Sequence, residues 1–167
     1  MAGDTAFLMD LALFKDFTST ELAQMSEILE EVELEPEQVL FKEGAWAASL
    51  YLVFSGAIDI YKQLTPEKEV TLTTLTTGAC LGEMALVRDM YRTGSAKAKV
   101  KSRLYVLKKD KLAKLSGTTP AVAARFYKNI SAILADRIDQ LNRDLARARE
   151  ASTEGKSSGL LSKLFGG

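Results

Sequence analysis

The chain has 167 residues, of which 47% are hydrophobic and 26% charged, and this predicts one domain with a single core. Lysine plus arginine and aspartate plus glutamate each number 22, so no net field attracts nucleic acid or an anionic membrane, and any bound anion must be held locally. The chain has no histidine and one cysteine, Cys80, which excludes histidine-dependent catalysis, nearly all zinc or iron sites and an internal disulfide.

The first predicted element is an amphipathic helix over residues 18–31. Thr18 and Glu21 have the spacing of a capping box, and apolar residues follow at helical intervals. Residues 39–115 then change to short β-rich runs separated by glycines, with a hairpin tip at 65–67. Short strands without intervening helices predict an antiparallel sandwich or jelly roll.

A long helix is predicted over residues 120–149, with its apolar side chains on one stripe. Part of this stripe has the spacing of a coiled-coil seam. The seam consists of Leu134, Ile138, Leu141 and Leu145. Two chains can pair along it as a homodimer, or the stripe can pack on the protein's own β-structure.

Residues 150–159 have the polar, small-residue composition of a linker, and an apolar tail follows at 160–167. The large apolar side chains of this tail are Leu160, Leu161, Leu164 and Phe165. Four such residues beyond a polar linker predict a contact surface. The tail either docks on an unidentified protein partner, folds back on its own domain or is disordered.

The stretch with the most chemical information is residues 81–93, between two β-rich runs. Gly82 lets the backbone approach a ligand, and residues 83–87 can form a helical turn whose first N–H groups suit an anion. Arg92 can make a forked contact to a phosphate, and Glu83 suits sugar hydroxyls. Taken singly, Glu83 can equally be a solvated acid and Arg92 a surface arginine. Together they indicate a ligand with a phosphate and a ribose.

The sequence Leu-Gly-Glu-Met-Ala-Leu at 81–86, with Arg92 and Thr93 after it, resembles the phosphate-binding cassette of the cyclic nucleotide-binding domain family. The resemblance covers residues 11–148. Outside the cassette it rests on Leu13, Phe14, Gly44, Tyr51, Gly56 and Gly78. It implies a mainly β fold with flanking helices, namely an eight-stranded antiparallel jelly-roll β-barrel with N-terminal helices and a long C-terminal helix.

The resemblance also implies a role for each cassette residue. Arg92 would pair with the cyclic phosphate, and Glu83 would accept a hydrogen bond from the ribose 2′-hydroxyl. Gly82 would offer its backbone near the ribose, and the backbone N–H groups of Ala85 and Thr93 would complete the phosphate cradle. The implied binding residues of the cassette are Gly82, Glu83, Met84, Ala85, Arg92 and Thr93.

The base is the least determined part of the expected ligand. Leu72, Ile60 and Leu75 fall where family members line the base pocket, although a core role explains them equally well. Asn142, on the predicted C-terminal helix, falls where bacterial activators contact the base, and its amide suits either purine. Thr93 suits guanine but also occurs in receptors for cyclic AMP. We favour cyclic AMP over cyclic GMP.

The predicted function is a cytoplasmic receptor that has no catalytic machinery, no metal and no cofactor other than its ligand. After the long helix only residues 150–167 remain, so output is expected to pass through a partner protein and not through DNA. A basic stripe on one strand face is expected to be solvated; it consists of Lys97, Lys99, Lys101 and Arg103. The alternative is a constitutive interaction module of the same fold whose pocket binds no nucleotide.

Overall fold

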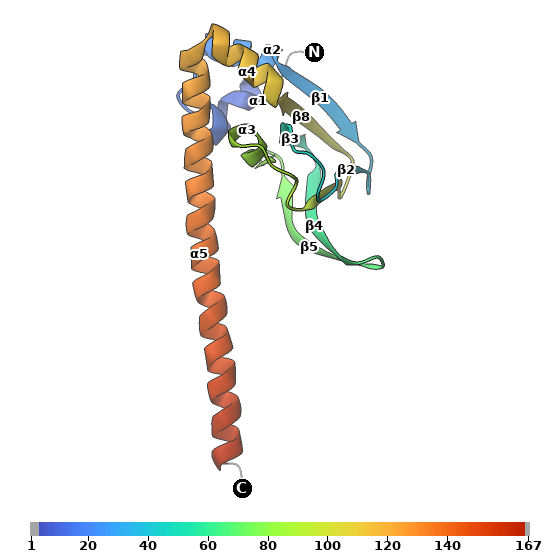
Figure 1. The fold of residues 1–167 in the computed structure, drawn as a ribbon, viewed down its shortest axis with the longest axis vertical. Coiled ribbons are helices and arrows are strands. Elements are labelled where there is room, and N and C mark those ends of the chain that lie inside the picture. Colours follow the sequence, from blue (N-terminus) through green and yellow to red (C-terminus); the bar gives the residue numbers. More distant parts are fainter. Residues whose placement is uncertain (1–3, 166–167) are drawn as a thin grey trace. The chain divides into compact units, whose positions relative to one another are not determined.

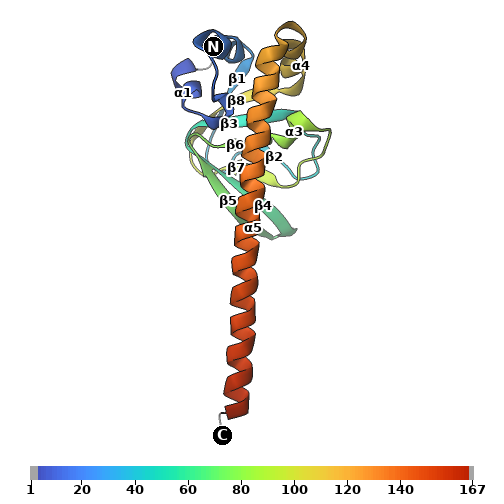
Figure 2. The same ribbon diagram turned by 90° about the vertical axis from the view of Figure 1, so that its left-hand side faces the viewer.

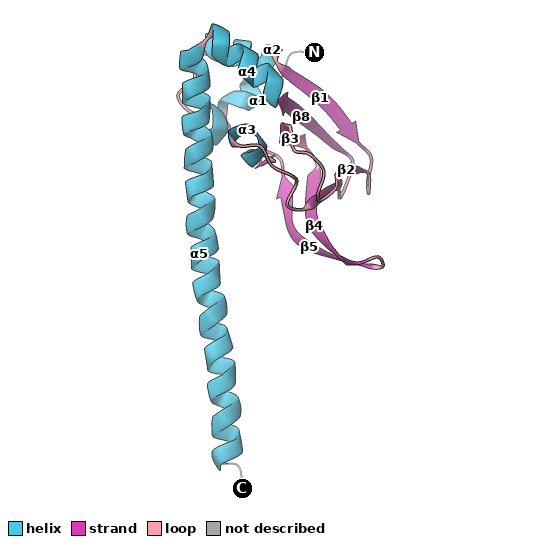
Figure 3. Cartoon of the chain, viewed as in Figure 1, coloured by secondary structure: helices cyan, strands magenta, loops and turns pink. Residues whose placement is uncertain are grey.

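The structure, a computed structural model, describes residues 4–165, with side chains described for residues 4–150. Within these residues, eight strands form two four-stranded antiparallel sheets, in the orders β1-β8-β3-β6 and β2-β7-β4-β5 (Figures 1 and 3). The strands are β1 (Leu29–Leu34), β2 (Val39–Phe41), β3 (Ser49–Ser55), β4 (Ala57–Thr65), β5 (Lys68–Thr76), β6 (Cys80–Leu81), β7 (Ser95–Ala98) and β8 (Ser102–Lys108).

One apolar core joins the two sheets. Its buried members come from strands of both sheets and are Leu34, Val53, Ile58, Leu81, Ala96, Ala98 and Leu104. Alternation along β4 shows how the strands supply it, because Ile58 lies in this core while the next residue, Asp59, accepts a 2.5 Å hydrogen bond from Thr74 Oγ1 instead. Each sheet keeps two edge strands. The predicted eight-stranded fold is therefore confirmed as jelly-roll-like, but it is not a closed barrel.

Helices flank the sheets. The short ones are α1 (Thr5–Met9), the 3₁₀ turn η1 (Ala12–Phe14), α2 (Ser19–Glu27), α3 (Met84–Val87) and α4 (Lys109–Thr118), and the long one is α5 (Pro120–Phe165). In Figures 1 and 2, α1 and α4 lie at one end of the sheets and the β4–β5 hairpin extends from the other. The hairpin turns between Thr65 and Lys68, as predicted.

The first predicted helix is shorter than expected. Its capping box is present, with Glu21 N–H donating to Thr18 Oγ1 and Thr18 N–H donating to Glu21 Oε2 at 2.8 Å. The helix ends at Glu27 instead of residue 31, since Leu29 begins β1. Cross-strand ion pairs to β8 stabilise this strand, and one joins Glu30 to Lys108. The β-region therefore starts before residue 39. It also ends earlier than the predicted residue 115, because β8 ends at Lys108 and the helix α4 follows.

The chain divides into two compact units, Met1–Asn129 and Ile130–Gly167, and the boundary falls within α5. In the first unit, the start of α5 packs on the N-terminal helices, with the rings of Phe126 and Phe14 5.8 Å apart. The buried Asn129 Nδ2 donates to the carbonyls of Leu13 and Lys15 at 3.0 and 2.9 Å. These contacts fix the first turns of α5 to the β-containing unit.

The second unit is the rest of α5. Three of the four predicted seam residues, Ile138, Leu141 and Leu145, are more than half exposed, and pairing of two chains along them stays a prediction. Residues 150–159 lie within α5, where a linker was predicted. The tail side chains Leu160, Leu161, Leu164 and Phe165 lie outside the described residues.

No helix within the described residues combines the length with the apolar character that a bilayer-spanning segment requires.

We expect Asn129→Ala to lower the free energy of unfolding by about 1–3 kcal/mol, because it leaves two carbonyls at the base of α5 without their donor. Urea unfolding followed by circular dichroism measures the change. Asn142→Ala, at an exposed position of the same helix, is the matched control and should cost less than about 0.5 kcal/mol. Equal costs for the two variants would contradict the anchoring role of Asn129.

The pKa of Glu21 lies below its ordinary 4.5, because Thr18 N–H donates to the carboxylate and the Thr18 hydroxyl and Arg125 also stabilise its charge. A lowered pKa in the folded state means that the stabilisation is present at neutral pH and is lost as the pH falls below about 4.5. Wild type should exceed Glu21→Gln in stability by about 0.5–1 kcal/mol at pH 7, and this gap should close by pH 3. The control Thr20→Ala changes an exposed, uncharged position of the same helix and should differ from wild type by the same amount at pH 7 and pH 3.

Candidate functional site

The loop that carries Arg92 is fixed by backbone pairing to residues 44–47. Arg92 N–H donates to the Ala45 carbonyl at 2.8 Å, and Gly44 N–H donates to the Arg92 carbonyl at 2.9 Å. One residue away, Tyr91 forms an isolated bridge with Trp46, and their rings meet edge to face with centroids 5.4 Å apart. The position of the Arg92 backbone therefore does not depend on its side chain.

Gly82 and Glu83 lie where β6 gives way to α3. Gly82 has a φ of +75°, which favours glycine, and a Cβ there would lie 2.9 Å from the Ser49 carbonyl oxygen and would overlap Arg92 Nη1. The Glu83 side chain is only 3% exposed. Ala85 N–H, a predicted phosphate donor, donates to the Gly82 carbonyl at 3.1 Å in this structure.

The guanidinium of Arg92 is buried, with the residue 7% exposed. Nη2 donates to the Ser49 carbonyl at 2.9 Å, and the Phe41 and Tyr51 ring centroids lie 4.2 and 5.4 Å from Cζ. Nε is also buried and makes no hydrogen bond within the described part of the chain. A buried N–H of a cation strongly favours an acceptor, so the site suits an anion.

Burial also sets the electrostatics of Arg92. Desolvation lowers the pKa of the guanidinium, while the Tyr51 phenol and the Glu83 carboxylate act in the opposite direction and raise it. An arginine stays protonated in proteins, so a positive charge is held here in a region of low dielectric. In such a region Arg92 attracts a bound anion more strongly than a surface arginine does.

The structure brings Gly82, Glu83 and Arg92 together. Met84 and Thr93 are exposed beside them. Leu72 is 58% exposed on β5, whereas Ile60 and Leu75 are partly buried and pack against the core. Asn142 is exposed on α5 in the second unit.

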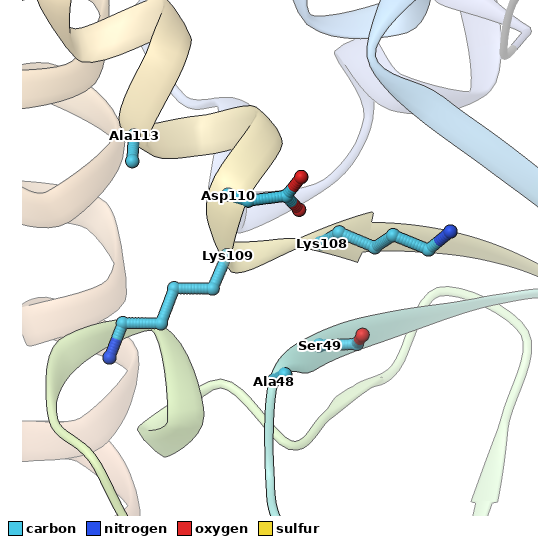
Figure 4. Close-up of a pocket in the computed structure, with 6 residues that line it drawn as sticks. All are labelled: Ala48, Ser49, Lys108, Lys109, Asp110 and Ala113. Atoms are coloured by element: carbon cyan, nitrogen blue, oxygen red, sulfur yellow. The ribbon is translucent and has the colours of Figure 1, made fainter.

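A hollow of about 490 Å³ lies where β3 begins and β8 passes into α4, and its lining is mostly apolar. Lys108 and Lys109 extend from it in opposite directions (Figure 4). Each already has an acidic partner, Glu30 at 2.7 Å and Asp89 at 2.7 Å respectively. The full lining is Ala48, Ser49, Lys108, Lys109, Asp110 and Ala113, which includes none of the predicted ligand contacts.

The basic stripe is engaged in ion pairs. Lys97 lies 2.8 Å from Glu37 and 2.5 Å from Glu69, and these partners raise its pKa. The other three cations also have acidic partners, in the pairs Lys99–Asp59, Lys101–Glu35 and Arg103–Glu31. Charges that are neutralised within the protein do not form a phosphate-binding surface. The predicted stripe on one strand face is wrong, however, because Lys97 lies on β7 and Arg103 on β8, in different sheets, with Lys99 and Lys101 between these strands.

The sequence did not identify the residues that hold Arg92. Phe41, Ser49 and Tyr51 belong to β2 and β3, far from the cassette in the chain. Tyr51 was part of the resemblance but had no assigned role. The sequence shows aromatic residues on two predicted strands, but that pattern is equally typical of an ordinary core and does not indicate a contact with Arg92.

Comparison with known proteins gives the same family as the resemblance. Residues 31–118 match the family profile described as "Cyclic nucleotide-binding domain". The chain is 30% identical over 111 residues to the cAMP-dependent protein kinase regulatory subunit of Yarrowia lipolytica, covering 66% of the chain and 29% of that protein. It is 31% identical over 106 residues to the cyclic AMP receptor protein of Thermus thermophilus, covering 64% and 47%. The chain thus spans less than half the length of these two relatives.

Solved structures agree at the level of the fold. A cyclic nucleotide-binding domain from Methylobacillus flagellatus superposes with a TM-score of 0.73 at 22% identity, covering 83% of this chain and 82% of that one. The Thermus thermophilus catabolite activator protein gives a TM-score of 0.71 at 25% identity, covering 83% and 63%. With the profile matching more than half of its residues, the chain belongs to the cyclic nucleotide-binding domain family.

Proposed function

We propose that this protein is a receptor for a cyclic purine mononucleotide, held by residues 81–93. Arg92 pairs with the cyclic phosphate, and Glu83 accepts a hydrogen bond from the ribose 2′-hydroxyl. The observation that carries the proposal is the buried Arg92 guanidinium beside Gly82 and a buried Glu83, with Nε lacking an acceptor among the residues that the structure describes. Membership of the family supports it.

The chemistry of the site explains why a cyclic phosphate suits it. A cyclic phosphodiester carries one negative charge, which one guanidinium neutralises, and Nε with an adjacent Nη can contact two of its oxygens at once. A carboxylate beside the same cation would repel a second phosphate group. The Glu83–Arg92 pair therefore favours a cyclic monophosphate with a free 2′-hydroxyl over a nucleoside diphosphate or triphosphate.

Cyclic AMP is the preferred ligand in this proposal. The relatives named above carry cyclic AMP in their names. Leu72 offers an apolar surface for a base, since 58% of it is exposed to solvent on β5. Asn142 supplies an amide that can contact either purine, and Thr93 a hydroxyl beside the phosphate. Cyclic GMP is the competing ligand.

The output of the receptor is not enzymatic. Ligand changes the C-terminal helix by binding one of its conformations better than another, and the helix signals to a partner protein. The tail residues Leu160, Leu161, Leu164 and Phe165 are the proposed contact for that partner. Two chains associate through the seam of Leu134, Ile138, Leu141 and Leu145, whose described side chains beyond Leu134 are mostly exposed.

We predict that Arg92→Ala weakens cyclic AMP binding by about 3–5 kcal/mol, because it leaves the phosphate charge buried without a partner. Isothermal titration calorimetry measures the affinity. Trp46, the only tryptophan, lies against Tyr91 and gives a second readout by fluorescence. Arg88→Ala removes an exposed arginine from the same loop and is the matched control, with a change below about 1 kcal/mol.

Two results would overturn this proposal. If neither cyclic AMP nor cyclic GMP produces heat or thermal stabilisation at millimolar concentration, the protein is a constitutive interaction module of the same fold. If Arg92→Ala binds as tightly as wild type, the phosphate lies elsewhere. The ratio of the two ligand affinities decides the base preference.

We also predict that Leu141→Glu shifts the protein from dimer to monomer, since a charge on the seam loses its apolar partner surface. Analytical ultracentrifugation measures the association. Gln140→Glu adds the same charge one position away from the seam and should leave the dimer intact. A wild-type protein that is monomeric at micromolar concentration would exclude the dimer.

A further inference from the structure

We infer that Phe41 and Tyr51 are positioning residues that hold the Arg92 guanidinium ready for its anion. This inference rests on the proposed function and adds residues outside the cassette to the site. Neither ring needs to touch the ligand; each acts through Arg92.

The two rings form one surface under the cation. They come from different sheets, Phe41 from β2 and Tyr51 from β3, and stack with centroids 5.7 Å apart and an interplanar angle of 30°. Arg92 Cζ lies 4.2 Å from the Phe41 centroid and 5.4 Å from that of Tyr51. Guanidinium groups stack on aromatic faces, and the attraction is strongest where water is excluded, as it is around this buried arginine.

Contacts at the edges of the guanidinium fix its rotation on these rings. The Ser49 carbonyl accepts from Nη2, and Gly82, which has no Cβ, lets Nη1 lie against the backbone. Ser49 and Tyr51 are two residues apart on β3, so one strand supplies both the carbonyl and a ring. With the face and two nitrogens placed, the Nε edge is left for an acceptor.

A similar pair elsewhere in the molecule provides the comparison. Arg103 lies over the Phe54 ring, with Cζ 4.8 Å from the centroid, but it is bound to the Glu31 carboxylate and is partly exposed. That arginine already has its anion, whereas Arg92 Nε makes no hydrogen bond among the described residues. Phe54→Leu is therefore the matched control: the same substitution, at a ring that also stacks on an arginine, outside the site.

The experiment compares Phe41→Leu, Phe41→Tyr and Phe54→Leu with wild type. We expect Phe41→Leu to weaken cyclic AMP binding about 10-fold by calorimetry, while Phe41→Tyr and Phe54→Leu stay within about 3-fold of wild type. Thermal unfolding shows that the variants remain folded. In ligand-free protein, the ring current of Phe41 should shift the NMR signal of the Arg92 Nε–H upfield. This shift should persist in Phe41→Tyr and Phe54→Leu and be lost in Phe41→Leu, where ¹⁵N relaxation should also show the Nε–H to be more mobile; a ring that only fills space would be lost without this gain in mobility.

The outcomes separate this inference from the proposed function. If wild type binds and Phe41→Leu binds equally well, or Phe54→Leu loses as much affinity, the positioning role is wrong and the receptor stands. If Phe41→Leu leaves the Nε–H signal unmoved, the ring does not hold Arg92, whatever the affinities. If wild type binds neither cyclic nucleotide, the proposed function fails. A Phe41→Leu variant whose Nε–H signal stays at the wild-type position would then reject the positioning role separately.

Discussion

The burial of one positive charge, on Arg92, constrains much of the surrounding structure. A guanidinium out of water is costly unless its faces and edges meet suitable groups, and the protein provides them from three places in the chain. Aromatic rings come from β2 and β3, a carbonyl from Ser49, and a backbone without a Cβ from Gly82. The pairing of Arg92 with residues 44–47 then holds its backbone in place. The backbone pairing therefore fixes the loop, and the contacts of the guanidinium fix the side chain.

The sequence was most informative about the cassette, where the order and spacing of residues within a short segment decide the geometry. It predicted that Gly82, Glu83 and Arg92 lie together, and they do. It could not predict Phe41, Ser49 and Tyr51, because their contacts with Arg92 join strands of two sheets across more than 40 residues of chain. Local periodicity carries no information about which core-facing ring will meet a given cation.

The same limit explains the differences in the fold. The capping box fixed the start of α2 correctly, because a helix N-terminus is decided by residues three apart. Its end could not be read in this way, since Leu29 begins β1 and pairs with Leu107 of β8, far along the chain. Short β-rich runs separated by glycines predicted the strands, but whether eight of them close into a barrel depends on edge pairings that no local pattern encodes.

The continuity of α5 across the boundary at Asn129 has a mechanical consequence. A helix of 46 residues is about 69 Å long, and its first turns are bound by Asn129 and Phe126 to the N-terminal helices. Beyond Ile130 the described side chains of α5 are mostly exposed, so the backbone hydrogen bonds of the helix itself supply most of its stability there. The helix is therefore stiffest over its buried first turns and should open locally more readily along its exposed part.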